Sequence, residues 1–369
     1  MRTQTENPAL IELIRNEIHD HGPQPFAWFM QQTLYHPEHG YYSSGRCAIG
    51  REGDYFTNVS VGPFFGQLLG AQFAEIWERL GKIDNFMIVE QGAHDGQFAL
   101  DILRSVQKRA PEFFEALRYR IVEPFPILQK QQSWALEPFR DKMEWRDSLQ
   151  SFVGVHFSNE LLDAMPVRLI GGGVEKLVGL EGDKFLFVER PLSQEAAASK
   201  LPSDKVSFNQ SALDWIDSVA ANLQRGYVIA IDYGRSGDEF EGNIQVRAQH
   251  RNLDSPFKQI GHADITLQVD WLTIVERAQA KGLRIAGFTD QHHFLTGIIS
   301  EWPELTKDPK TRRALQTLLH PEMLGRSFQV LALGKEAAAE DFALAAPLAG
   351  FKFARDPRSL LGLGQPIPR

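Results

Sequence analysis

The chain has 369 residues, of which 43% are hydrophobic, and this is enough to bury the core of one large α/β unit with an appended piece. Its formal net charge of -8 gives no overall basic field to attract nucleic acid or an anionic membrane, and no long apolar run predicts a membrane span. One cysteine, Cys47, excludes an internal disulfide and a multi-cysteine metal site, and the start of the chain has no apolar signal core. We therefore expect a cytoplasmic protein without a metal.

Residues 1–80 predict helices joined by loops. A helix is expected to begin near Asn7-Pro8, with Leu10, Ile14 and Ile18 among the residues on its apolar face. A second, apolar-aromatic helix is expected from about 63 to 80, where Gly81 ends it. Because the loops between them are rich in Tyr, Gly and His, we expect this segment to cap a ligand site.

The stretch 86–103 combines a strand, an acid, a glycine turn and the start of a helix. The apolar run 86–89 is typical of a strand buried on both faces, Glu90 ends it, and Gly92 and Gly96 free the backbone for a sharp turn. Neither GxGxxG nor GxxxxGK[ST] is present, so an acidic turn facing a cationic or hydroxyl-bearing ligand such as S-adenosylmethionine is the better physical match. An ordinary tight strand-to-helix turn would have the same spacing.

A second strand is predicted at 119–123, one strand-helix-strand unit further on, and it ends in Glu123. A carboxylate at the tip of this strand can accept hydrogen bonds from the two vicinal hydroxyls of a ribose. The alternative is a surface acid that caps the next turn, since Pro124 follows directly.

A third strand, predicted at 153–159, leads into the string SNELLDAMPV. At the topological switch of an open sheet, Asn159 and Glu160 would meet the ligand held by the glycine turn. If Glu160 begins a helical turn, Glu160 and Asp163 project from one face and could hold a guanidinium. Acids that merely favour the dipole of a helix N-terminus would give the same pattern.

Later elements are less regular. A β-hairpin is predicted within 168–190, a helix at 213–223, a buried strand at 226–232 and a helix at 271–280. Strands are predicted at 284–288 and 327–333, around a helical stretch at 300–319. The segment 235–268, with His250, Asp264 and Thr266, has little regular pattern and is interpreted as a substrate-side insertion. Residues 336–369 are interpreted as a surface-wrapping or mobile tail.

Several motifs in order resemble those of the MidA-type methyltransferases, a family that includes the mitochondrial complex I assembly methyltransferase and its bacterial relatives. The resemblance covers about residues 25–335 and rests on the strings YHPEHGYY at 35–42, GDYFT at 53–57, SNELLDAMPV at 158–167, DYG at 232–234, and DIT with VD at 264–270. It implies a class I, Rossmann-like methyltransferase fold with a seven-stranded mixed sheet and a core at 81–335. It also implies S-adenosylmethionine as cofactor and a protein arginine as the type of acceptor.

Carried over residue by residue, the resemblance places the cofactor turn on Glu90, Gly92 and Gly96, the ribose acid on Glu123, and the motif after the fourth strand on Asn159, Glu160 and Asp163. Two departures stand out. His94 replaces the middle glycine of the turn, where its ring could crowd or contact the cofactor, and the family's TSPExS segment reads TNVSVG at 57–62.

The residues and the resemblance together predict in-line transfer of a methyl group from a sulfonium to a nitrogen, with Glu160, Asp163 and Asn159 on the reaction side. Asn159 is expected to contact the cofactor as well. The partner would be a protein substrate and not a nucleic acid. Two alternatives stay open: a methyltransferase-like scaffold that has lost catalysis and binds a partner protein, and an enzyme with a small-molecule acceptor.

Overall fold

The computed structural model describes residues 6–45, 47, 57–192, 207–235, 243–249, 251–309, 311–335 and 346–363. The chain divides into two compact units. The first unit comprises residues 1–56, 162–214 and 241–268, and the second comprises 57–161, 215–240 and 269–369.

The second unit is built on a mixed sheet with the strand order β14-β15-β9-β5-β2-β3-β4, to which β13 adds by pairing with β9. All neighbours along this path are parallel except those of β15, which runs antiparallel to both β14 and β9. The strands are β2 (Phe86–Gln91), β3 (Leu117–Val122), β4 (Met143–Arg146), β5 (Phe152–Asn159), β9 (Leu223–Arg235), β13 (Val269–Asp270), β14 (Arg284–Asp290) and β15 (Phe328–Lys335). This path of seven strands confirms the mixed sheet that the resemblance implied, and β15 reverses the direction at one edge.

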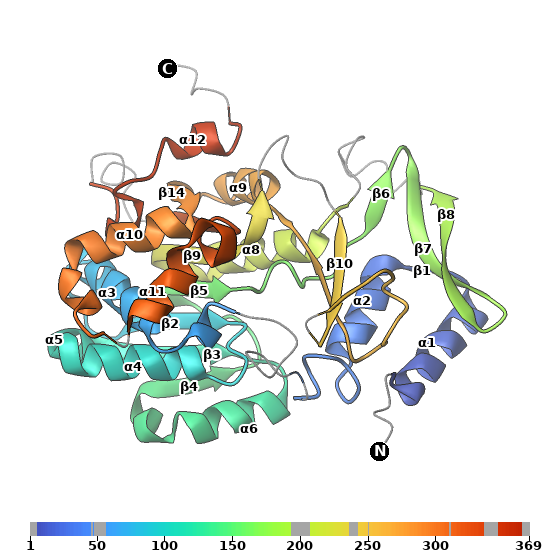
Figure 1. Ribbon diagram of the computed structural model, residues 1–369, viewed down its shortest axis with the longest axis horizontal. Coiled ribbons are helices and arrows are strands. Elements are labelled where there is room, and N and C mark those ends of the chain that lie inside the picture. Colours follow the sequence, from blue (N-terminus) through green and yellow to red (C-terminus); the bar gives the residue numbers. More distant parts are fainter. Residues whose placement is uncertain are drawn as a thin grey trace. The chain divides into compact units, whose positions relative to one another are not determined.

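The strand β2 lies in the interior of this sheet, between β3 and β5, and most of its residues are buried. Ile88 pairs with Tyr119 of β3 and with Val155 of β5. One face is covered by α3 (Phe64–Arg79), α4 (Gln97–Arg109) and α10 (Gln291–Glu301), as Figure 1 shows. There Phe98 of α4 stacks on Phe157 of β5 with ring centroids 4.4 Å apart. Because β2 is parallel to both β3 and β5, the carboxyl ends of these three strands lie at the same edge of the sheet.

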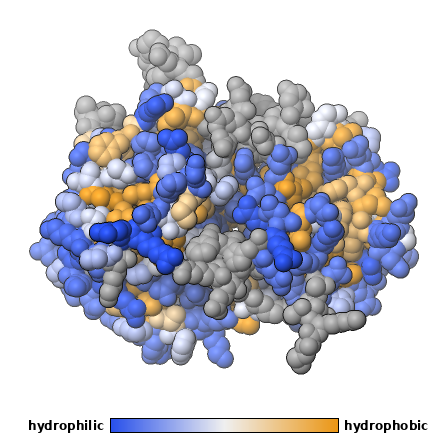
Figure 2. Space-filling model, viewed as in Figure 1, coloured by the Kyte–Doolittle hydropathy of each residue, from blue (hydrophilic) through white to orange (hydrophobic). Residues whose placement is uncertain are grey.

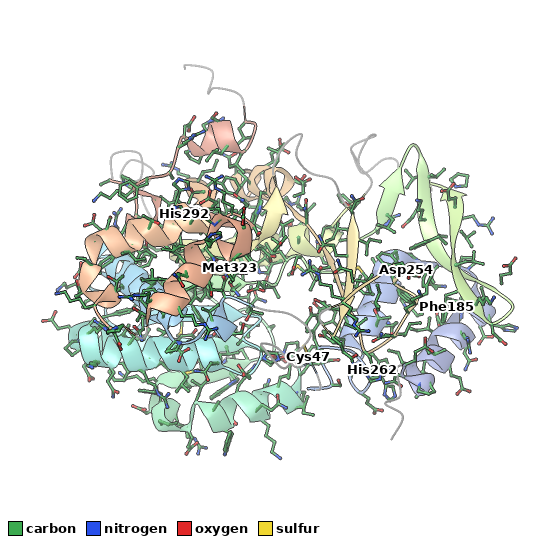
Figure 3. The ribbon with its side chains drawn as sticks, viewed as in Figure 1. Cys47, Phe185, Asp254, His262, His292 and Met323 are labelled. Atoms are coloured by element: carbon green, nitrogen blue, oxygen red, sulfur yellow. The ribbon has the colours of Figure 1, made fainter. Side chains whose placement is uncertain are left out.

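The predicted helix at 271–280 is present as α9 (Trp271–Ala280), and the helix expected at 213–223 as α8 (Gln210–Asn222). Within the helical stretch that follows β14, α11 (Thr311–Leu319) packs beside α10. His292, labelled in Figure 3, contributes to this packing because its Nδ1 lies 2.7 Å from the carbonyl oxygen of Leu319.

The segment 346–363 wraps around the second unit. Gln72 and Glu75 of α3 accept hydrogen bonds from the backbone amides of Gly350 and Ala349, at 2.8 and 3.0 Å. Phe351 is buried, so this part of the predicted tail belongs to the core. The rest of the tail, 336–345 and 364–369, lies outside the described residues.

The first unit contains α1 (Pro8–His21), α2 (Phe26–Tyr35) and a sheet of β1 (Gln24–Pro25), β7 (Val174–Glu181), β6 (Leu169–Gly171) and β8 (Lys184–Pro191). The predicted hairpin is confirmed by the antiparallel pair β7 and β8, which turns at Gly182. An aromatic cluster holds these elements together: Phe185 of β8, labelled in Figure 3, lies near Phe29 of α2 and Phe257.

The segment 235–268 forms regular structure that its sequence pattern did not predict. Within its described residues, β10 (Ile244–Ala248) pairs antiparallel with both β11 (Arg251–Leu253) and β12 (Asp264–Leu267). These strands are short, and β10 is only partly buried, which leaves a weak periodic signal in the sequence. His250 lies outside the described residues.

Among the helices of the described ranges, none is long and apolar enough to cross a membrane. The face seen in Figure 2 carries many hydrophilic residues between its apolar patches.

Candidate functional site

The turn after β2 has three residues in the left-handed region, with φ of 81° at Gly92, 47° at His94 and 82° at Gly96. Gly96 is the N-cap of α4, and its amide donates to the carbonyl of Ala93 at 2.8 Å. Left-handed backbone costs a residue with a side chain about 1–2 kcal/mol. His94 therefore occupies a strained position that the surrounding structure must hold.

Both glycines also make close packing possible. A Cβ atom at Gly92 would lie 3.3 Å from Leu161 Cδ1, and one at Gly96 would lie 3.2 Å from Leu136 Cδ1. The turn after β2 thus rests on Leu161, which follows β5, and on the segment after β3. The positive φ of Gly92 and Gly96 is a feature of the fold. A role for these two glycines in binding a ligand stays a prediction.

Glu90 lies inside the sheet and not in the open turn. Only 4% of the residue is exposed, and its Oε2 accepts a hydrogen bond from the hydroxyl of Tyr119 at 2.7 Å. Burial raises the pKa of Glu90 to about 8, with the Tyr119 hydrogen bond opposing this and Asp95 adding to it. The carboxyl is therefore mainly protonated at neutral pH.

Glu123 follows β3 and is buried as well. Its Oε1 accepts from the amide of Phe125 at 3.0 Å, and its Oε2 accepts from Gln132 Nε2 at 3.1 Å. Burial raises the pKa of Glu123, while these hydrogen bonds and His94 oppose the rise. A carboxylate has about four lone-pair positions, so these two bonds leave acceptor capacity, which suits the diol of a ribose. The side chain chemistry thus fits the predicted cofactor.

Gln132, on α6 (Pro126–Ala135), is a site residue that the sequence analysis missed. Its Nε2 donates to the carbonyl of His94 at 2.9 Å and to the Glu123 carboxylate, and its Oε1 accepts from the indole of Trp145 at 3.1 Å. It is fully buried. A signal did exist, because Gln132 lies four residues after the buried Leu128, on the inward face of the helix.

Asn159, the last residue of β5, and Glu160, which follows it, form a hydrogen-bonded cluster with Asn58. Glu160 Oε1 accepts from Asn159 Nδ2 at 2.8 Å and from the amide of Asn58 at 3.0 Å, and Asn159 Oδ1 accepts from Asn58 Nδ2 at 2.9 Å. Asn58 is completely buried, and its Oδ1 has no hydrogen-bond partner in the described part of the chain. Asn58 belongs to the TNVSVG departure, so this segment contributes polar groups beside Glu160.

The turn that follows Glu160 is fixed by the end of β9. The amide of Glu160 donates to the carbonyl of Ile231 at 2.9 Å, and the amide of Leu161 donates to Asp232 Oδ2 at 3.0 Å. The Asp of the DYG string therefore holds the backbone that places Glu160. Gly234 of the same string is needed for space, since a Cβ there would lie 2.4 Å from Trp271 Nε1.

The expected helical turn at Glu160 is not formed. Glu160 has φ of 53°, which a right-handed helix excludes, and no helix follows in 160–166. The argument that Glu160 and Asp163 share one helix face is therefore wrong. Glu160 belongs to the second unit and Asp163 to the first, where the carbonyl of Asp163 accepts from the amide of Leu267 at 2.8 Å.

Other motif strings meet inside the first unit. The hydroxyl of Tyr42, from YHPEHGYY, donates to Asp264 Oδ1 of DIT at 2.5 Å, and the hydroxyl of Tyr35 donates to the carbonyl of Ala164 at 3.1 Å. Gly53 to Phe56 lie outside the described residues. Where the structure describes the chain, no group of three or more His, Cys, Asp or Glu residues could hold a metal ion.

Comparisons with known proteins identify the family of the chain. A family model described as "Putative S-adenosyl-L-methionine-dependent methyltransferase" matches residues 68–289. The mitochondrial protein arginine methyltransferase NDUFAF7 of Bos taurus is 28% identical over 377 residues, covering 89% of this chain and 84% of that protein. Its homolog in Drosophila melanogaster is 24% identical over 385 residues, covering 90% and 86%.

A solved structure from Burkholderia thailandensis, bound to S-adenosyl-homocysteine, is 28% identical to this chain. It covers 95% of this chain and 96% of its own, with a TM-score of 0.81. The family model spans more than half of the chain, and the fold agrees nearly throughout. The chain therefore belongs to this family of S-adenosyl-L-methionine-dependent methyltransferases, as its resemblance to the MidA-type enzymes implied, and S-adenosylmethionine is its cofactor.

Proposed function

We propose that this methyltransferase transfers the methyl group to an arginine nitrogen of a protein substrate. The observation that carries the proposal is the Glu160 carboxylate, held by Asn58 and Asn159 where β5 ends beside β2. An anionic group ordered at this edge suits a guanidinium, which presents several N–H donors and stays charged at neutral pH. The names of the relatives, which are protein arginine methyltransferases, support the same acceptor.

The residues act mainly by position. When bound, S-adenosylmethionine supplies an electrophilic methyl group on a sulfonium sulfur. Gly92, Gly96 and Glu123 would hold it, with the carboxylate of Glu123 accepting hydrogen bonds from ribose hydroxyls. Glu160 would orient the guanidinium, with its Oε1 held by two donors. The acceptor nitrogen would lose one proton to solvent as its bond to the methyl carbon forms and the bond from that carbon to sulfur breaks, which leaves S-adenosylhomocysteine.

The test incubates the purified protein with S-adenosylmethionine that carries a labelled methyl group and with a protein extract. The extract is made from a strain of the source organism that lacks this gene. After the reaction, acid hydrolysis and amino-acid analysis identify the labelled product, which we expect to be methylarginine. The key variant is Glu160→Gln, because its side-chain oxygen can still accept both hydrogen bonds while the charge is lost. We expect about 100-fold less labelling with S-adenosylhomocysteine affinity retained. Glu78→Gln, at an exposed position of α3, is the matched control and should label normally.

Other outcomes would replace the proposal. Label confined to small molecules would favour a small-molecule acceptor, and methyllysine would identify a different protein side chain. Cofactor binding without any label would favour the scaffold alternative. A role for Asp163 and a cytoplasmic location stay predictions.

A further inference from the structure

We propose that Gln132 is a positioning residue of the cofactor site. It fixes the position of the strained glycine turn relative to the Glu123 carboxylate, which would bind ribose. The inference rests on the cofactor part of the proposed function, in which Glu123 binds ribose. Gln132 joins the two elements directly, because one amide nitrogen donates to the carbonyl of His94 at 2.9 Å and to Glu123 Oε2 at 3.1 Å.

The orientation of the Gln132 amide is fixed by its third partner. An indole N–H only donates, so Trp145 Nε1, at 3.1 Å, requires the amide oxygen of Gln132 on its side. The nitrogen must then face His94 and Glu123. Since Gln132 is fully buried, water does not compete for its amide group.

The hydrogen bond from Gln132 to the His94 carbonyl stabilises a histidine at a position of the turn where the family has glycine. A histidine at φ of 47° tends to leave the left-handed region, and the hydrogen bond to its carbonyl opposes this. The helix α6 also packs directly under the turn, because a Cβ at Gly96 would lie 3.5 Å from the Cα of Gln132. Loss of Gln132 would release both the turn and the carboxylate.

The contact with Glu123 has a second consequence. The hydrogen bond from Gln132 stabilises the ionised carboxylate and so opposes the rise in pKa that burial causes. Of the elements packed around Glu123, the glycine turn presents the titratable His94, while α6 presents the neutral Gln129 and Gln132 and β4 the neutral Trp145. Without Gln132, Glu123 should take up a proton at higher pH.

The experiment measures S-adenosylhomocysteine affinity by calorimetry from pH 5 to 9 in the full chain. Gln132→Met removes both donated hydrogen bonds at similar volume, and Gln131→Met, one position away and exposed, is the matched control. We expect roughly tenfold weaker binding for Gln132→Met at neutral pH, and an acid limb of the affinity profile displaced to higher pH. Gln131→Met should match the unmodified protein. Repeating both in a His94→Asn background removes the titration of the imidazole.

A second variant guards against misfolding of Gln132→Met. Trp145→Phe removes the donor that orients the amide, together with the pyrrole ring of the indole, but leaves Gln132 in place, and it should give a smaller displacement of the acid limb in the same direction. If Gln132→Met and Trp145→Phe are folded and match the unmodified protein in affinity and pH profile, the inference is wrong and the proposed function stands. If the unmodified protein itself binds no S-adenosylhomocysteine, the proposed function fails and the inference fails with it.

Discussion

The stability of the second unit should fall as the pH rises from 5 to 8, because of Glu90. This carboxyl is buried in the central strand β2 and has a pKa of about 8, against 4.5 for an ordinary glutamate. The folded state therefore binds a proton that the unfolded state has released over this interval. By linkage, the contribution is complete below pH 4.5 and is lost as the pH passes through about 8.

The size of the effect follows from the two pKa values. Their difference corresponds to a decrease in the free energy of unfolding on the order of 5 kcal/mol between low and high pH, since each pKa unit is worth about 1.4 kcal/mol. Glu90→Gln removes the titration and keeps an oxygen that can accept the hydrogen bond of Tyr119. The variant should be about as stable as the unmodified protein at pH 5 and several kcal/mol more stable at pH 9.

Urea unfolding followed by tryptophan fluorescence, at intervals between pH 5 and 9, measures this difference. Taking the difference between variant and unmodified protein cancels the groups that titrate in both. Glu78→Gln, at an exposed position of α3, should show no such trend. A difference between Glu90→Gln and the unmodified protein that stays constant from pH 5 to 9 would refute the assignment of a buried, protonated carboxyl.

Three substitutions test the chain geometry. Gly96→Val places a branched side chain at φ of 82° and against Leu136. It should abolish S-adenosylhomocysteine binding in calorimetry and lower the free energy of unfolding by about 1–3 kcal/mol. Full binding would contradict this. His94→Gly removes the backbone strain of a side chain at positive φ and should keep S-adenosylhomocysteine binding. The thermal midpoint should change little, because the larger entropy of the unfolded chain with glycine offsets the relief of strain. Lost binding would show that the imidazole ring is required. Gly234→Ala brings a Cβ to 2.4 Å from Trp271, so the free energy of unfolding in urea should fall by about 2 kcal/mol or more, and an unchanged value would exclude the clash.

The sequence predicted the sheet of the second unit well because several of its strands are largely apolar. The apolar run at 86–89 corresponds to β2, and the strand predicted at 153–159, in which polar residues interrupt the apolar ones, corresponds to β5. The two late strands were predicted from the sequence, but the topology of that edge rested on the resemblance. The short strands β10 to β12 escaped prediction because β10 and β11 are mostly not buried, and the buried strand β12 has only four residues and begins with an acid.

The site was predictable only in part. Glycine spacing and acids at strand ends pointed to Gly92, Gly96 and Glu123, which the structure gathers around one turn. The left-handed φ of Glu160 could not be foreseen, since it depends on Ile231 and Asp232 of a strand some seventy positions later. Side chains that act through other side chains, such as Gln132, carry no motif.

The antiparallel strand β15 constrains how the protein is synthesised. Residues 328–335 pair with both β9 and β14, and among the described strands β15 is the one that links β14 to the sheet. Until these residues leave the ribosome, the nascent chain keeps one side of β9 unpaired, and such an edge invites pairing with other chains. The sheet therefore cannot be completed during translation until residues 328–335 have emerged, which makes shielding of β9 by chaperones most valuable before that point.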